Sequence, residues 1–139
     1  MKLCDKCDGA VTMIYDTDII IFFLRGSHKA AQTLENDDNK HLSIQSYMEL
    51  IQNPKDKQEQ LTIRNFVYEA DFAVIPFTNN ISHRAAIYIE QFALSHGLRS
   101  ADALIAATAA ENNLALCSAN KKHFQFLNDI EFIPFDPEA

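Results

Sequence analysis

Short apolar runs alternate along the chain with longer segments whose apolar residues recur every three or four positions. The short runs predict β-strands over residues 13–15, 41–44, 73–77, 114–117 and 130–135. The segments between them have the spacing of amphipathic helices. Strands separated by helices favour right-handed crossovers and a parallel sheet covered on both faces. The pattern therefore predicts an α/β fold, a three-layer α/β/α sandwich around a central, mostly parallel sheet.

The predicted helices have recognisable start signals. Residues 19–24 are apolar on every side, so the choice of a helix rests on Thr17 or Asp18 as a cap and on Gly26 as a stop. The sequence from Ser46 to Glu49 has the form of a capping box at the start of a helix. This capping role alone is enough to explain why a glutamate stands at position 49. The remaining predicted helices cover residues 27–36 and 56–72, a long segment capped by Asn79 or Asn80 and closed by Gly97, and residues 100–110 with Ser100 as the cap.

Asp102 lies in the first turn of the last of these helices. Ile105, Ala106 and Ala109 follow it at i+3, i+4 and i+7, so its carboxylate is expected on the same face as a buried apolar stripe. A buried carboxylate must be paired, hydrogen-bonded, neutralised or bound to a metal. Either the helix N-terminus satisfies Asp102 or the residue is a functional acid, and the pattern leaves both interpretations open.

Other polar residues follow predicted strands. Asp16 directly follows the first strand, at the position where open α/β sheets bind ligands. N-capping of the next helix explains Asp18, but it does not explain why Asp16 precedes it. Glu49 follows the second strand, Asn120 follows the fourth, and Asp102 is expected near the same edge. Two carboxylates about 4 Å apart repel by roughly 4 kcal/mol at an effective dielectric constant near 20, so such a cluster needs a cation or a shared proton. Oxygen ligands of this kind suit Mg²⁺ or Mn²⁺, which can activate a water for phosphodiester hydrolysis.

Composition narrows the possible functions. A chain of 139 residues with 47% hydrophobic residues is expected to form one domain. The net charge of −7 argues against binding nucleic acid by bulk attraction, and only three glycines are present, in no phosphate-binding motif. An odd number of cysteines and the lack of a long apolar run or secretory signal predict a cytoplasmic protein without a membrane segment.

The first twelve residues are polar and are expected to be an N-terminal extension to a domain over residues 13–139. Cys4 and Cys7 form a Cys-x-x-Cys pair. Such a pair can be half of a zinc site, but no second pair stands at a suitable spacing nearby, which favours a disordered tail.

Four blocks of the sequence, residues 13–18, 43–50, 101–109 and 117–124, resemble in content and order the four motifs of PIN domains, in particular the VapC-type toxins. The resemblance covers about residues 13–135. It implies an endoribonuclease that uses Mg²⁺ or Mn²⁺ held by Asp16, Glu49 and Asp102, directly or through water. Asn120 occupies a position where the family often has Asp, so it offers a neutral oxygen and leaves open whether one or two ions bind. The resemblance also implies a small antitoxin partner and a homodimer.

Further residues are candidates for contact with the RNA substrate. The hydroxyls of Thr17 and Ser118 are placed to bind phosphate or metal-bound water, although helix capping accounts for both. The candidate cations are Arg25, Arg84, Arg99, Lys121 and Lys122, each of which is also explained as a solvated surface charge.

Two other functions remain open from the sequence. Asp16 and Asp18 form an Asp-x-Asp after a strand, which is similar to the first motif of haloacid-dehalogenase phosphatases; the paired acidic motif that those enzymes need is missing after the fourth strand until Asp129. A catalytically silent PIN-like binding module is the second alternative, and Asn120 is the sequence feature that suggests it.

Overall fold

The computed structural model describes residues 11–137 and contains one five-stranded sheet. Its strands are β1 (Met13–Tyr15), β2 (His41–Ser43), β3 (Ala73–Ile75), β4 (Ala115–Ser118) and β5 (Phe132–Pro134). They lie in the order β3-β2-β1-β4-β5, and every neighbouring pair is parallel. The predicted α/β fold with a parallel sheet is confirmed. Cys4, Cys7 and most of the predicted extension lie outside the described residues.

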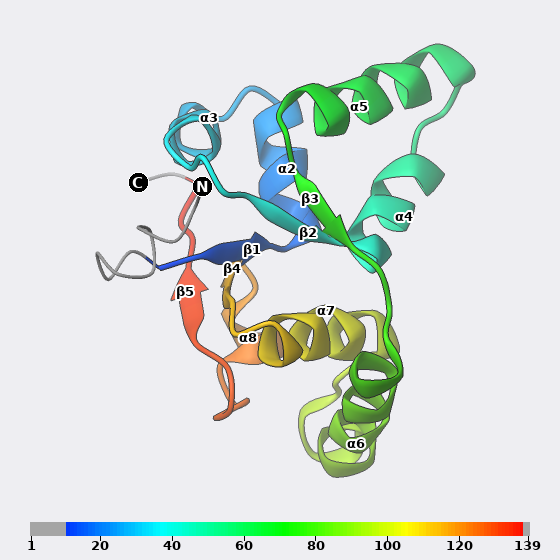
Figure 1. The fold of residues 1–139 in the computed structure, drawn as a ribbon, viewed down its shortest axis with the longest axis vertical. Coiled ribbons are helices and arrows are strands. Elements are labelled where there is room, and N and C mark those ends of the chain that lie inside the picture. Colours follow the sequence, from blue (N-terminus) through cyan, green and yellow to red (C-terminus); the bar gives the residue numbers. More distant parts are fainter. Residues whose placement is uncertain (1–10, 138–139) are drawn as a thin grey trace.

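Helices cover both faces of the sheet (Figure 1). On one side lie α2 (Thr17–Leu24), α3 (His28–Glu35), α4 (Ile44–Gln52) and α5 (Lys57–Glu69), and on the other lie α6 (Asn79–His96), α7 (Ser100–Glu111) and the short α8 (Lys121–Phe124). Among the helices of residues 11–137, none combines the length and apolar composition that a membrane crossing requires.

The central strands bury side chains on both faces. In β1, Ile14 belongs to the apolar cluster of α6 and α7, whereas Tyr15 packs with Ile19 of α2 and Leu34 of α3. Both strand residues have no exposed surface. This alternation explains why the strand reads as a continuous apolar run, as is typical of parallel sheets.

Two helices begin earlier than the sequence predicts. Asp16 is the N-cap of α2, so the prediction of Thr17 or Asp18 as the cap is wrong. Ser43 is the N-cap of α4 and its hydroxyl accepts a hydrogen bond from the Gln45 amide, so the predicted capping box of Ser46 and Glu49 is wrong as well. In both places the strand passes into the helix without a connecting loop. Glu49 therefore does not cap the start of α4.

The starts of α6 and α7 also differ from the prediction. The hydroxyl of Thr78, and neither Asn79 nor Asn80, caps α6. Ser100 is the first residue of α7 rather than its cap, and the N-cap residue Arg99 makes no side-chain capping bond. Asp102 nevertheless lies in the first turn of α7, as predicted, and this position is what matters for the site.

The strand order creates a switch point beside β1. The chain builds β2 and β3 on one side of β1 and then crosses to form β4 and β5 on the other. Ligands of open α/β sheets bind outside the carboxyl ends of the strands at such a point. Asp16, which follows β1, and Ser118, the last residue of β4, therefore meet at the expected binding edge.

Candidate active site

Asp16 is buried and held by hydrogen bonds with β4 and with the first residue of α2. Its backbone N–H donates to the carbonyl of Cys117 at 3.0 Å, which continues the sheet ladder. One carboxylate oxygen accepts from the Thr17 amide at 2.8 Å, and the other accepts from the Ser118 hydroxyl at 2.7 Å. With only 5% of its surface exposed, Asp16 has a fixed orientation at the switch point.

Asp18 is the second acid of this edge. Its Oδ2 accepts from the Ala119 amide at 3.1 Å and from the Asn120 side-chain nitrogen at 3.2 Å. Its Oδ1 is buried and has no hydrogen-bond partner among residues 11–137. In the sequence, helix capping accounts for Asp18, and its signal for a site role is the Asp-x-Asp spacing with Asp16 that resembles the phosphatase motif.

Asp102 and Glu49 come to the edge from two helices. Oδ2 of Asp102 lies 3.2 Å from Nδ1 of His123, a residue to which the sequence analysis gave no role. Glu49 accepts a bond from the Gln45 side chain at 3.2 Å, and its charge also acts on Asp102. Burial raises the pKa of Asp102, and the negative charge of Glu49 raises it further, while His123 and Arg99 oppose this. The predicted acids are thus electrostatically coupled.

The carboxylates perturb one another. Burial and the charge of Asp18 raise the pKa of Asp16 to about 7, although the bonds from Ser118 and Thr17 work against this. Burial likewise raises the pKa of Asp18, with a contribution from the charge of Asp102. Mutual repulsion of this kind is relieved by protonation or by a cation.

The donor set fits a hard divalent cation. Its acids offer only oxygen ligands, and Oδ1 of Asp18 is a buried oxygen without a hydrogen-bond partner in the described part of the chain. Within residues 11–137, no three His, Cys, Asp or Glu side chains converge closely enough to hold an ion directly. The arrangement therefore fits an ion bound to one or two carboxylates with water between it and the others, as Mg²⁺ commonly binds.

Asn120, Thr17 and Ser118 lie beside these acids. The side-chain nitrogen of Asn120 donates to Asp18, so in this structure the residue acts as a hydrogen-bond donor. The hydroxyl of Thr17 is buried and makes no hydrogen bond to a described residue. Ser118 is fully buried and donates to Asp16.

The predicted cations divide into two groups. Lys121 and Lys122 are exposed on α8, directly after Asn120, and Arg99 is exposed beside the first turn of α7. Arg25 instead follows the last residue of α2 and stands nine residues after Asp16, about 13 Å along the helix.

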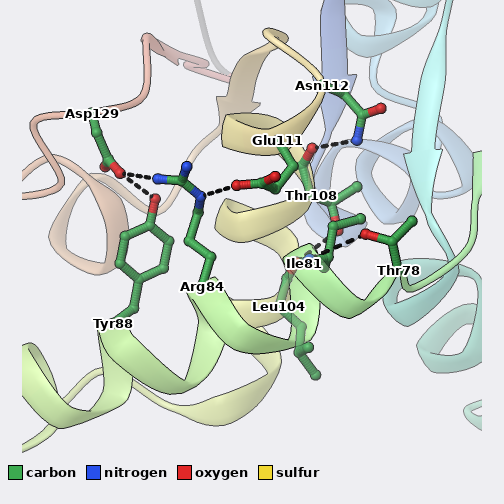
Figure 2. A network of polar contacts seen from close by, with 9 residues as sticks. All are labelled: Thr78, Ile81, Arg84, Tyr88, Leu104, Thr108, Glu111, Asn112 and Asp129. Carbon is green, nitrogen blue, oxygen red and sulfur yellow. Dashed lines mark hydrogen bonds and ion pairs between the residues drawn. The ribbon is translucent and has the colours of Figure 1, made fainter.

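Arg84 also lies apart from the acids, in a network on α6 (Figure 2). Its guanidinium pairs with Glu111, the last residue of α7, and with Asp129 at 2.7 Å. The hydroxyl of Tyr88 donates to the same Asp129 carboxylate at 2.8 Å. Glu111 stands nine residues after Asp102, about 13 Å along the helix. Through these contacts Arg84 joins α6, α7 and the segment before β5.

Residues 13–138 match the family model described as PIN domain. The chain belongs to the PIN domain family. It is 30% identical over 123 residues to Ribonuclease VapC10 of Mycobacterium tuberculosis, a match that covers 86% of this chain and 90% of the relative. The family membership agrees with the resemblance found in the four sequence blocks.

Solved structures share the fold of this PIN domain. One is a toxin-antitoxin complex from Klebsiella pneumoniae, with a TM-score of 0.73, 24% identity, and coverage of 91% of this chain and 98% of that one. Another is VapBC2 from Rickettsia felis bound to a promoter DNA fragment, with a TM-score of 0.75, 17% identity, and coverage of 91% and 100%. At these identities the comparison supports the architecture.

Proposed function

We propose that this PIN domain protein is a Mg²⁺- or Mn²⁺-dependent endoribonuclease and the toxin of a toxin-antitoxin pair, acting on RNA in the cytoplasm. The observation that carries the proposal is the buried Asp16, whose pKa is raised to about 7, next to Asp18, one of whose carboxylate oxygens has no hydrogen-bond partner within residues 11–137. Perturbed acids at a ligand-binding edge are typical of functional sites. The 30% identity to a protein named as a ribonuclease supports the same reaction.

In this proposal four acids hold the ion, directly or through water: Asp16, Asp18, Glu49 and Asp102. The bound ion supplies an activated water and neutralises charge on the scissile phosphodiester. Ser118 and Asn120 keep Asp16 and Asp18 oriented through their hydrogen bonds. Because Asn120 donates to an acid, we assign it a supporting role rather than that of a ligand.

Contacts to the RNA are assigned to groups that border the acids. Lys121, Lys122 and Arg99 are exposed there and are proposed to bind backbone phosphates, and the hydroxyl of Thr17 is proposed to bind metal-bound water. Arg25 and Arg84 are left out because they lie elsewhere on the molecule. Local cations of this kind can attract a polyanion to the site on a chain whose net charge is −7.

The proposed partner is a small antitoxin, and the proposed assembly is a homodimer. Structures with this fold include a toxin-antitoxin complex, which supports the antitoxin. An arginine or lysine of the antitoxin is expected to reach the carboxylates, since charge-assisted hydrogen bonds to such a cluster are strong. Expression without the antitoxin should arrest bacterial growth. Harmless accumulation of folded wild-type protein would argue against the toxin role.

The two alternatives are less well supported. The match of residues 13–138 to the PIN family argues against a haloacid-dehalogenase-like phosphatase. A silent binding module was suggested by Asn120, but this residue has a place in the site as a donor to Asp18. A silent module would also have no need for the coupled acids at the sheet edge.

RNA cleavage by the purified protein tests the proposed activity. We expect cleavage of a mixed RNA pool in Mn²⁺ or Mg²⁺, none in EDTA, and a loss of about 100-fold or more in Asp16→Asn. Asp71→Asn is the matched control, because Asp71 is exposed at a left-handed backbone position that asparagine tolerates. Full cleavage by Asp16→Asn would contradict the proposed site.

A further inference from the structure

A single segment after β4 contacts three aspartates of the site. Ser118 donates to Asp16, and Asn120 together with the Ala119 amide donates to Asp18. Three residues further on, His123 contacts Asp102. The segment thus reaches acids that the chain supplies from β1, α2 and α7.

We infer that His123 is a positioning residue of the metal site, whose ring nitrogen holds the Asp102 carboxylate in the orientation that binds the ion. The inference rests on the proposed function, because it assigns His123 a role toward the metal that this function requires. It extends that function by a residue that is neither an acid nor a candidate phosphate contact.

The position of His123 is fixed by anchors on either side. Ser118 is fully buried at the end of β4, and Phe124 is fully buried in the cluster with Leu116. Between them, the Asn120 amide donates to the Ser118 hydroxyl at 3.0 Å, and the His123 amide donates to the Asn120 carbonyl at 3.1 Å. A side chain on such a short, doubly anchored segment loses little additional entropy when it holds a neighbour.

The imidazole lies at the surface and contacts the less exposed Asp102 carboxylate. The side chain of His123 is 49% exposed, whereas that of Asp102 is 19% exposed, and their atoms lie 3.2 Å apart. The ring can carry a proton on Nδ1 in a neutral tautomer and in the protonated form, so it can present an N–H to the carboxylate in either state. A group 3.2 Å from a ligating carboxylate is placed to act as its outer partner. Loss of such partners typically weakens metal affinity or activity by 10- to 100-fold.

Mn²⁺ affinity without RNA, measured by calorimetry, tests the inference. His123→Phe keeps a ring but removes the donor, and His123→Ala is a second donor-free variant; both should bind Mn²⁺ about 10-fold more weakly. His123→Asn places an N–H near the Nδ1 position and should restore most of the affinity. His28→Phe, at an exposed position at the start of α3, is the matched control and should bind like the wild type.

The background of Asp102→Asn shows whether His123 acts through Asp102. There, adding His123→Phe should change Mn²⁺ affinity by less than about twofold, since the two residues form one unit. In RNA cleavage, His123→Phe should lower kcat more than it raises KM. Unchanged Mn²⁺ affinity in both donor-free variants, or a rise in KM alone, would overturn the positioning role. A wild-type protein that binds no Mn²⁺ would instead overturn the proposed function itself.

Discussion

Asp16 shows how one residue can serve both the fold and the proposed chemistry. It caps α2 and also presents a buried carboxylate at the switch point. The sequence predicts site roles for Asp16, Asp102 and Asn120 because each has a readable place after a strand or in the first turn of a helix. It offers Asp18 only in the phosphatase alternative and predicts no role for His123. The contact of Asp18 with Ala119 and that of His123 with Asp102 join residues far apart in the sequence, which no local pattern contains.

The raised pKa of Asp16 predicts a pH dependence of stability. In the folded, metal-free protein its pKa rises from 3.8 to about 7, so the folded state binds a proton that the unfolded state has lost. The resulting stabilisation is complete below about pH 4 and is lost as the pH rises through about 7. Thermal melting in EDTA should therefore show a lower Tm at pH 8 than at pH 5, with a smaller difference in Asp16→Asn. Equal pH slopes in the two proteins would contradict the burial of this acid.

At the scale of elements, strand and helix types were predictable but helix starts were not. Apolar runs and helical spacing identified the five strands and the helices between them. Ser43, however, is both the last residue of β2 and the cap of α4, although Ser46 is also a residue type that caps helices. At the start of α6, residues 78–80 are all of types that cap helices. Hydrogen-bond competition among neighbouring polar residues decides between such starts, and the apolar pattern carries no information about it.

The position of Ser46 in α4 gives a stability prediction. Its side chain is fully buried, and its hydroxyl has no hydrogen-bond partner among the described residues. Removing an unsatisfied buried hydroxyl is favourable, and alanine is also the better helix former. Ser46→Ala should raise the free energy of unfolding of the metal-free protein by about 1 kcal/mol, as measured by urea denaturation. A decrease would show that the hydroxyl is satisfied in solution.

At the scale of the whole molecule, the parallel sheet was predictable but its strand order was not. The order brings β1 beside β4 and lets Ser118 donate to Asp16 across 102 positions of sequence. That pairing depends on how the helices of both layers pack, which local periodicity does not encode. For the same reason the sequence could not separate Arg84, which joins three elements, from the cations that border the acids.

Arg84 is expected to stabilise the assembly of α6, α7 and the segment before β5. Arg84→Gln removes its pairs with Glu111 and Asp129 and should lower the free energy of unfolding by about 1 kcal/mol, a modest value because the side chain is about one-third exposed. RNA cleavage well below the Tm should be retained. Lost cleavage with an unchanged Tm would instead indicate that Arg84 contacts the substrate.

The central claim is that the acids at the sheet edge hold the ion that supports RNA cleavage, and Asp102→Asn tests it most directly. The change keeps the size of the side chain and removes one negative charge from a crowded site. Without metal, the variant should be no less stable than the wild type, because repulsion with Glu49 is relieved. In Mg²⁺ or Mn²⁺, cleavage of RNA should fall by about 100-fold or more. A variant that cleaves RNA at the wild-type rate would contradict the account.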